Sequence, residues 1–257
     1  MIQTTIRVKR KVEFRNPILV EGLPGLGSVG AIAISYMVKK LKARKFAELL
    51  SPFFPHHVIV DKGGNVRLLQ AEFYFLKLTG GNDLILLTGD SQAQTINGQY
   101  EMVEKILDFV QECGVRTIVT LGGYYAAGED DLPEVICAST NPVLQSKMLK
   151  AGATHSPTGN PIVGAAGLFL GLTRLRGIDA ACLLGETTGY VPDPRAAKSV
   201  LVVLRKALGV KIDLNDLDEA IKKSDGVVKS VAEIQKRMEA LERVSREKEE
   251  GKITYIS

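Results

Sequence analysis

The chain has 257 residues, of which 45% are hydrophobic and 24% are charged; this composition is typical of folded globular proteins and unlike that of a disordered chain. Its formal net charge of +4 is too small to predict nucleic-acid binding, which is associated with a stronger, clustered basic patch. No apolar run reaches the roughly 18 residues that a membrane span requires, and the N-terminal sequence MIQTTIRVKRKVEF has no apolar signal core, so we predict a cytoplasmic protein without a membrane partner.

Strand-like and helical patterns alternate along most of the chain. In the first half of the chain we expect, in order, a strand at 17–21, a helix at 28–42, a hairpin with strands 57–61 and 66–78 around Lys62-Gly63-Gly64, a strand at 83–87 and a helix at 100–112. In the second half we expect strands at 117–121 and 133–139, helices at 142–151 and 163–176, a strand at 180–184 and a helix at 195–208. This alternation predicts a mostly parallel central sheet with helices on both faces, and the hairpin predicts that the sheet is mixed.

The last part of the chain differs in kind from the rest. A heptad-like seam with spacings of 4, 3, 4 and 3 is formed by Val227, Val231, Ile234, Met238 and Leu241. Seven of the nine residues from 242 to 250 are charged, so the end of this helix is not expected to be buried. We predict an α/β core at 1–213 and a C-terminal helical arm with a short apolar tail at 214–257. The arm either packs as a terminal helix with a solvated end, or it meets a neighbouring subunit or holds the tail outward.

A glycine-rich block follows the first expected strand and opens the first expected helix. It contains a formal GxGxxG pattern and consists of Gly22, Gly25, Gly27 and Gly30 with their neighbours. In a dinucleotide site such glycines let a pyrophosphate approach the helix N-terminus. The acidic partner expected about 20 residues on would be Glu48, but Glu48 is followed by a hairpin-like segment. A tight structural turn is therefore the favoured interpretation, and a nucleotide-binding regulator is an alternative.

Two acidic residues are candidates for acid–base chemistry. Asp90 and Glu186 both lie in loops expected after strands, where the crevice of an α/β sheet binds its ligands. Each is equally suited to bonding backbone amides in a turn. The three widely spaced cysteines and the adjacent His56 and His57 form no recognisable metal-ligand pattern, so we predict no metal and no cofactor.

The tail is apolar and aromatic after a polar helix. A free end with these side chains and a carboxylate is suited to binding a partner as a peptide, or to pairing as a short edge strand with the protein's own sheet. The residues concerned are Ile253, Tyr255, Ile256 and Ser257.

Four blocks together resemble the proteasome assembly chaperone 2 family, especially its archaeal-type members. They are NPILVEGLPGLGSVG at 16–30, TGDSQAQTINGQYEM at 88–102, GNPIVGAAGLFLGL at 159–172 and LGETTGYVPDPRAA at 184–197. The resemblance implies a three-layer α/β/α fold related to nucleoside phosphorylases and similar hydrolases, together with self-assembly and no established catalytic chemistry. It also implies that the glycine block is the first strand-to-helix turn of that fold.

Some members of that family carry a C-terminal hydrophobic-Tyr-X motif that inserts between proteasome α-subunits. Here Tyr255 stands one place earlier than that pattern, because Ile256 is the penultimate residue. One residue reverses the side-chain direction in an extended segment, so this register is expected to misplace the ring relative to the carboxylate.

We therefore predict a non-catalytic, homo-oligomeric assembly chaperone or scaffold. Its expected partners are further copies of itself, and proteasome α-subunits or a paralogue. The enzyme alternative is a small-molecule phosphorylase or hydrolase with Asp90 and Glu186 as acid and base in the crevice at the C-terminal edge of the sheet. That alternative requires the two side chains to converge in one pocket.

Overall fold

The computed structural model describes residues 3–126, 133–189 and 191–222. One central sheet has the strand order β1-β3-β6-β7-β2-β8-β11-β9-β10. Its strands are β1 (Thr5–Val8), β2 (Ile18–Glu21), β3 (Arg44–Leu50), β6 (Ala71–Leu76), β7 (Leu84–Gly89), β8 (Thr117–Tyr125), β9 (Val135–Ser139), β10 (Thr154–His155) and β11 (Asp179–Thr187). The neighbours β7, β2, β8 and β11 are parallel, whereas β1, β3 and β6 are added antiparallel, so the expected mixed sheet is confirmed.

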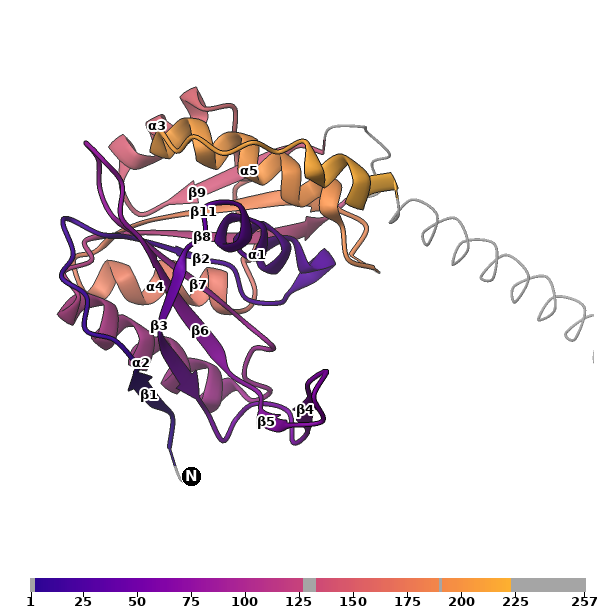
Figure 1. Ribbon diagram of the computed structural model, residues 1–257. Helices are drawn as coiled ribbons and strands as arrows, with labels where there is room; N and C mark the ends of the chain where they lie inside the picture. Colours follow the sequence, from indigo (N-terminus) through magenta and orange to yellow (C-terminus); the bar gives the residue numbers. More distant parts are fainter. Residues whose placement is uncertain (1–2, 127–132, 190, 223–257) are drawn as a thin grey trace, which may run out of the picture. The chain divides into compact units, whose positions relative to one another are not determined.

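Helices cover both faces of this sheet (Figure 1). They are α1 (Val29–Lys40), α2 (Ile96–Glu112), α3 (Pro142–Lys150), α4 (Ala165–Leu175) and α5 (Pro194–Leu208), with a short 3-10 turn, η1 (Leu26–Ser28), before α1. Helices α1, α3 and α5 pack together on one face, and α2 and α4 pack together on the other. The predicted three-layer α/β/α fold is confirmed.

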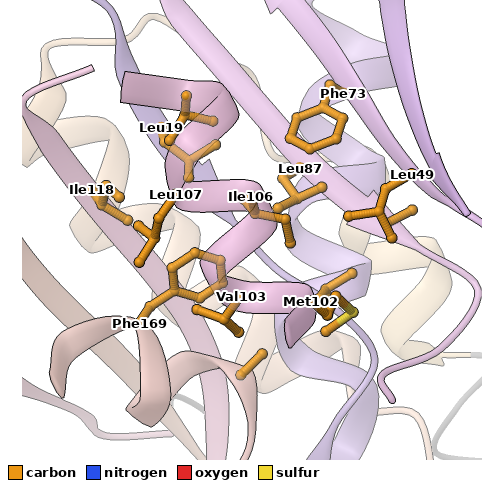
Figure 2. Packing of buried hydrophobic residues seen from close by; sticks show 14 of the residues in the cluster. Leu19, Leu49, Phe73, Leu87, Met102, Val103, Ile106, Leu107, Ile118 and Phe169 are labelled. Atoms are coloured by element: carbon orange, nitrogen blue, oxygen red, sulfur yellow. The ribbon is translucent and has the colours of Figure 1, made fainter. Parts of the chain in front are cut away.

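The main hydrophobic core lies between the sheet and the pair α2 and α4. Figure 2 shows Leu19 and Leu87 of the central strands against Ile106 and Leu107 of α2, with Phe169 of α4 beside them. All five side chains are fully buried. Burial of such side chains is worth about 1.5–3 kcal/mol each before the entropy of ordering is subtracted, so this layer holds α2 and α4 against the central strands.

Local sequence signals set where several helices begin. The Asp193 side chain accepts hydrogen bonds from the amides of Arg195 and Ala196 at the start of α5, as capping residues do. At the start of α2, the Thr95 hydroxyl accepts a hydrogen bond from the Gly98 amide at 3.1 Å. Helix α2 therefore begins at Ile96, four residues before the predicted start at Tyr100.

Residues 66–78 form two strands that belong to different sheets. The first, β5 (Val66–Leu68), pairs antiparallel with β4 (Val58–Val60) in a separate hairpin, as the turn at Lys62-Gly63-Gly64 predicts. The second, β6, enters the central sheet between β3 and β7. The prediction of one continuous hairpin strand over 66–78 was wrong in this respect, because the chain changes sheets after Leu68.

Residues 1–214 form one compact unit, and a second unit begins at Asn215. The predicted arm residues, Val227, Val231, Ile234, Met238 and Leu241, lie outside the described residues. The boundary near residue 213 and the role of the arm therefore stay predictions. Within the described part of the chain, no helix combines the length and apolar character needed to cross a membrane.

Candidate functional site

A cavity of about 440 Å³ lies at the carboxyl ends of β2, β8 and β11. Strand β2 pairs with β8 as far as Glu21 and Thr120, whereas β8 and β11 remain paired up to Thr187 and Tyr125. After Glu21 the chain turns away from β8 through the glycine block, and this leaves a hollow beside the last residues of β8. We name it the Glu21 cavity; its walls include Leu23, Gly25, Leu26, Gln92, Leu121, Gly122, Gly123, Tyr124, Pro161, Ile162, Gly164, Ala166 and Leu184.

Glu21 is the acidic residue among the described residues that line this cavity, and it is only 1% exposed. Since alternate residues of a strand face the same side, its side chain lies on the face of Leu19, which α2 and α4 cover. Its Oε1 atom accepts a hydrogen bond from the Leu23 amide at 2.8 Å, and its Oε2 atom has no partner among the described residues. Burial raises the pKa of Glu21 to about 8, although the Leu23 hydrogen bond acts in the opposite direction.

Two further buried residues continue this row across the sheet. Glu21 is in register with Thr120 of β8, and Thr120 is in register with Cys182 of β11. The Thr120 hydroxyl donates to the carbonyl oxygen of Ala166 in the first turn of α4. Burial raises the pKa of Cys182 to about 12, so its thiol stays neutral beside Glu21 at physiological pH.

Gln92 joins three segments at the edge of the Glu21 cavity. Its Nε2 atom donates to the Pro24 carbonyl of the glycine turn at 2.8 Å. Its Oε1 atom accepts from the Ala165 amide and from Nε2 of Gln99, both at 2.9 Å. These bonds tie the loop after β7 to the glycine turn and to the start of α4, so this wall is preformed.

The glycine block holds α1 unusually close to the sheet. A Cβ atom on Gly22 would lie 2.3 Å from the carbonyl oxygen of Gly30, and one on Gly30 would lie 2.3 Å from that of Leu121. Gly27 has a φ of +57°, and a Cβ atom there would lie 2.7 Å from Oγ1 of Thr187. Gly25 lies farther from its neighbours and lines the cavity. At Gly22, Gly27 and Gly30, these contacts leave no room for a side chain.

Asp90 is engaged in an ion pair with the β4–β5 hairpin. Its carboxylate accepts hydrogen bonds from both terminal nitrogens of Arg67, at 2.6 and 2.9 Å, and from the Gln70 amide at 2.9 Å. Partial burial alone would raise the pKa of Asp90, but these three bonds outweigh it and lower the pKa below its usual value. The carboxylate is thus a structural acceptor in this arrangement.

Glu186 lies near the end of β11, on the other side of β2 and β8 from Asp90. Its Oε2 atom accepts a long hydrogen bond, of 3.4 Å, from the backbone amide of Glu134. Strands β7 and β11 are three positions apart, which corresponds to about 14 Å at the usual spacing between strands. Asp90 lines a depression with Ser35, Val38 and Tyr74, whereas Glu186 is not part of that depression. The structure does not bring the two predicted acid–base candidates together.

The tail residues Ile253, Tyr255, Ile256 and Ser257 lie outside the described residues. Glu21 and Gln92, in contrast, both line the Glu21 cavity, but the sequence analysis did not identify them as site residues. The signal for Glu21 was an acidic residue ending the apolar run PILVE. Gln92 lies in the block at 88–102, but nothing in that block marked it as a wall residue, because its role depends on three segments that meet only in the folded chain.

Comparison with known proteins adds a consistent set of similarities. The PAC2 family model matches residues 19–232. The uncharacterized protein MJ1210 of Methanocaldococcus jannaschii is 34% identical over 234 residues, which cover 91% of this chain and 90% of that protein.

Two solved structures from Pyrococcus furiosus are similar over nearly their whole length. PbaB, described as an archaeal proteasome activator, is 41% identical with a TM-score of 0.85, covering 90% of this chain and 100% of that one. PbaA, described as an archaeal homolog of proteasome-assembly chaperone, is 26% identical with a TM-score of 0.72, covering 98% of this chain and 100% of that one.

Proposed function

This chain belongs to the PAC2 family, as its four sequence blocks predicted, and on that premise we propose that it is a non-catalytic, homo-oligomeric scaffold that binds proteasome α-subunits. The observation that carries the proposal is the 41% identity and TM-score of 0.85 with PbaB, over the full length of that described activator. A cytoplasmic location is part of the proposal, and the three free thiols of Cys113, Cys137 and Cys182 are compatible with it.

The placement of the two acidic candidates supports the non-catalytic part of the proposal. An acid–base pair must reach one reacting centre, and Asp90 and Glu186 lie on opposite sides of β2 and β8. Arg67 also engages the Asp90 carboxylate directly. A phosphorylase or hydrolase mechanism using this pair has no geometric support.

The β4–β5 hairpin supports the self-assembly part of the proposal. Val58, Val60, Val66 and Leu68 are each 47–63% exposed on this small sheet. A two-stranded sheet is marginally stable alone, and clustered apolar side chains on a surface mark interaction sites. Because the same hairpin is present on every copy, symmetric pairing of two copies would bury both apolar clusters at once.

The C-terminal tail is the proposed contact with the proteasome. Repeated copies of a weakly binding tail gain affinity when their spacing matches that of the binding sites. In this chain Tyr255 stands one position before the penultimate place, so tail binding is expected to be weaker than that of a hydrophobic-Tyr-X tail and to depend more on the number of copies.

Native mass spectrometry of the full chain tests this proposal. The chain is measured alone, with free proteasome α-subunits and with assembled proteasome, beside a variant that ends at Lys252. We expect a defined oligomer that binds one of the two proteasome forms only when the tail is intact. Binding to free α-subunits would indicate an assembly role, and binding to the assembled particle with faster peptide hydrolysis would indicate an activator. An oligomer that binds neither form would contradict the proposal.

A further inference from the structure

We propose that the Glu21 cavity binds a small neutral molecule whose carbonyl oxygen accepts a hydrogen bond from the carboxyl group of Glu21 and whose apolar body lies against Leu23, Ile162 and Leu184. The Oε2 atom of Glu21 is fully buried, so the carboxyl group turns toward the cavity to make this bond. This binding site is separate from the proteasome contact in the tail. The two proposals therefore stand or fall on different measurements.

The state of Glu21 defines what the ligand must offer. Because Oε1 already accepts the Leu23 amide, the proton of the neutral carboxyl group resides on Oε2. Burial keeps this carboxyl group protonated at neutral pH, with a pKa of about 8. Oε2 then carries one hydroxyl donor, and no described residue accepts from it. A buried donor without an acceptor is costly, so the matching ligand group is a hydrogen-bond acceptor.

The surroundings of Glu21 favour a neutral ligand over an ion. Among the residues that the structure describes, those that line the Glu21 cavity include no lysine or arginine to compensate an anion, and burying an unpaired charge is strongly unfavourable. A bound ammonium group carries three donors and a positive charge, and the protonated carboxyl group of Glu21 supplies no negative charge to pair with it. A single acceptor oxygen satisfies the hydroxyl donor of Glu21.

The shape of the cavity sets the size of the ligand. Its volume of about 440 Å³ is at the lower end of the range for small-molecule pockets. Gly122 and Gly164 leave the space open: a Cβ atom on Gly122 would lie 3.0 Å from a methyl carbon of Leu184, and one on Gly164 would lie 3.1 Å from Oε1 of Gln92. A molecule with one or two rings and a carbonyl group at one end fits this chemistry.

Saturation-transfer NMR with three ring compounds of similar size tests the proposal on the full chain. The probes are caprolactam, which is a neutral cyclic amide, cyclohexylamine, which is a cation, and cyclohexanecarboxylate, which is an anion. We expect caprolactam to bind at neutral pH and both ions to bind at least about tenfold more weakly. Tighter binding of the cation would overturn the proposal, and so would the absence of caprolactam binding at millimolar concentration.

Matched variants locate the binding. Glu21→Gln retains a donor and a neutral side chain, so caprolactam binding is expected to persist. Glu21→Leu removes the donor at similar volume and is expected to weaken binding at least about tenfold, the usual scale for losing one buried hydrogen bond. Glu186→Gln, near the same edge of the sheet and outside the cavity lining, serves as the control and is expected to bind as the unchanged chain does. Unchanged binding in Glu21→Leu would overturn the proposal.

The dependence of binding on pH separates this interaction from simple hydrophobic binding. The other titratable groups near Glu21 in the described part of the chain are Cys182 and, at the cavity wall, Tyr124 and Tyr125. Burial raises the pKa of Cys182 and of Tyr124 above the range of the experiment. Caprolactam binding to the unchanged chain is therefore expected to fall above pH 8, where Glu21 ionises, and to stay constant in Glu21→Gln. The same pH profile in both proteins would contradict the assignment to Glu21.

Discussion

The guanidinium group of Arg67 binds the carboxylate of Asp90 through two hydrogen bonds, of 2.6 and 2.9 Å. Arg67 lies in β5 of the separate hairpin, and Asp90 directly follows β7 of the central sheet. The pair therefore fastens the hairpin, with its exposed apolar side chains, to the core. A residue that the sequence suggested as an acid–base candidate has a structural role in this arrangement.

Replacing Asp90 by Asn is expected to loosen this attachment. The amide keeps one acceptor but loses the charge, so we expect a loss of about 1 kcal/mol in the free energy of unfolding and faster amide exchange in β4 and β5. The pKa of Asp90 is lower in the folded chain than its ordinary value of 3.8. The contribution of the ionised Asp90 to folding stability is therefore fully present above pH 3.8 and is lost as the pH falls through the lowered pKa. Hydrogen exchange at pH 7 checks this, with Asp179→Asn on β11 as control; equal exchange in β4 and β5 of both variants would contradict it.

The raised pKa of Glu21 predicts a pH-dependent stability. Between pH 4.5 and about 8 the unfolded chain ionises Glu21, while the folded chain keeps the proton. The folded state then binds more protons, so its stability falls as pH rises through this interval and levels off above it, with a slope of up to about 1.4 kcal/mol per pH unit. Urea unfolding of the unchanged chain and of Glu21→Gln at pH 5, 6, 7 and 8 measures this. Parallel curves for the two proteins would show that Glu21 does not titrate as predicted.

Gly30 is expected to tolerate no side chain. A Cβ atom there would lie 2.3 Å from the Leu121 carbonyl oxygen, so Gly30→Ala must push α1 away from β8, at a cost of about 3 kcal/mol. Gly171 in α4 is the matched control, because a Cβ atom there meets no heavy atom within 4 Å. Gly171→Ala is expected to gain about 0.5–1 kcal/mol from helix propensity. Thermal unfolding compares the two, and equal effects would contradict the close packing of α1.

Exchanging the order of the aromatic and aliphatic residues in the tail is expected to strengthen proteasome binding. The double change Tyr255→Ile with Ile256→Tyr moves the ring to the penultimate position. A correctly placed aromatic anchor is worth more than 1 kcal/mol in many interfaces, so we expect about a tenfold gain in affinity. Surface plasmon resonance with immobilised proteasome measures it. Equal affinity of the exchanged and original tails would show that the register of the ring does not limit binding.

Opposite charges placed on the two strands of the β4–β5 hairpin are expected to prevent self-assembly without unfolding the hairpin. Val60 and Val66 are directly opposite each other in β4 and β5, so Val60→Glu with Val66→Lys adds a favourable cross-strand pair and removes exposed apolar surface. Native mass spectrometry is expected to show a smaller assembly than that of the unchanged chain. Val143→Lys on α3, where the side chain is 79% exposed, is the control; an unchanged mass in the hairpin variant would exclude this surface.

The sequence predicted the parallel centre of the fold better than its antiparallel side. Strands β2, β7 and β11 contain short apolar runs, which are typical of buried strands. Strand β3 was not recognised, because its buried Glu48 reads as a surface residue. In the fold, Lys9 and Lys45 bind the Glu48 carboxylate at 2.8 and 2.9 Å. Lys45 belongs to the same strand as Glu48, whereas Lys9 follows β1, a separate segment that only the sheet brings beside β3.

The sequence alone determined the family, the alternation of strands and helices, and the glycine turn, because these depend on local periodicity and on motifs within one segment. Only the tertiary structure decided which polar residues share a site. Asp90 and Glu186 are separated because β2 and β8 lie between their strands. Glu21 is protonated because α2 and α4 bury the face on which it lies. Strand order and burial arise from contacts between distant segments, and the free energy of a charge depends on those surroundings more than on its neighbours in the chain.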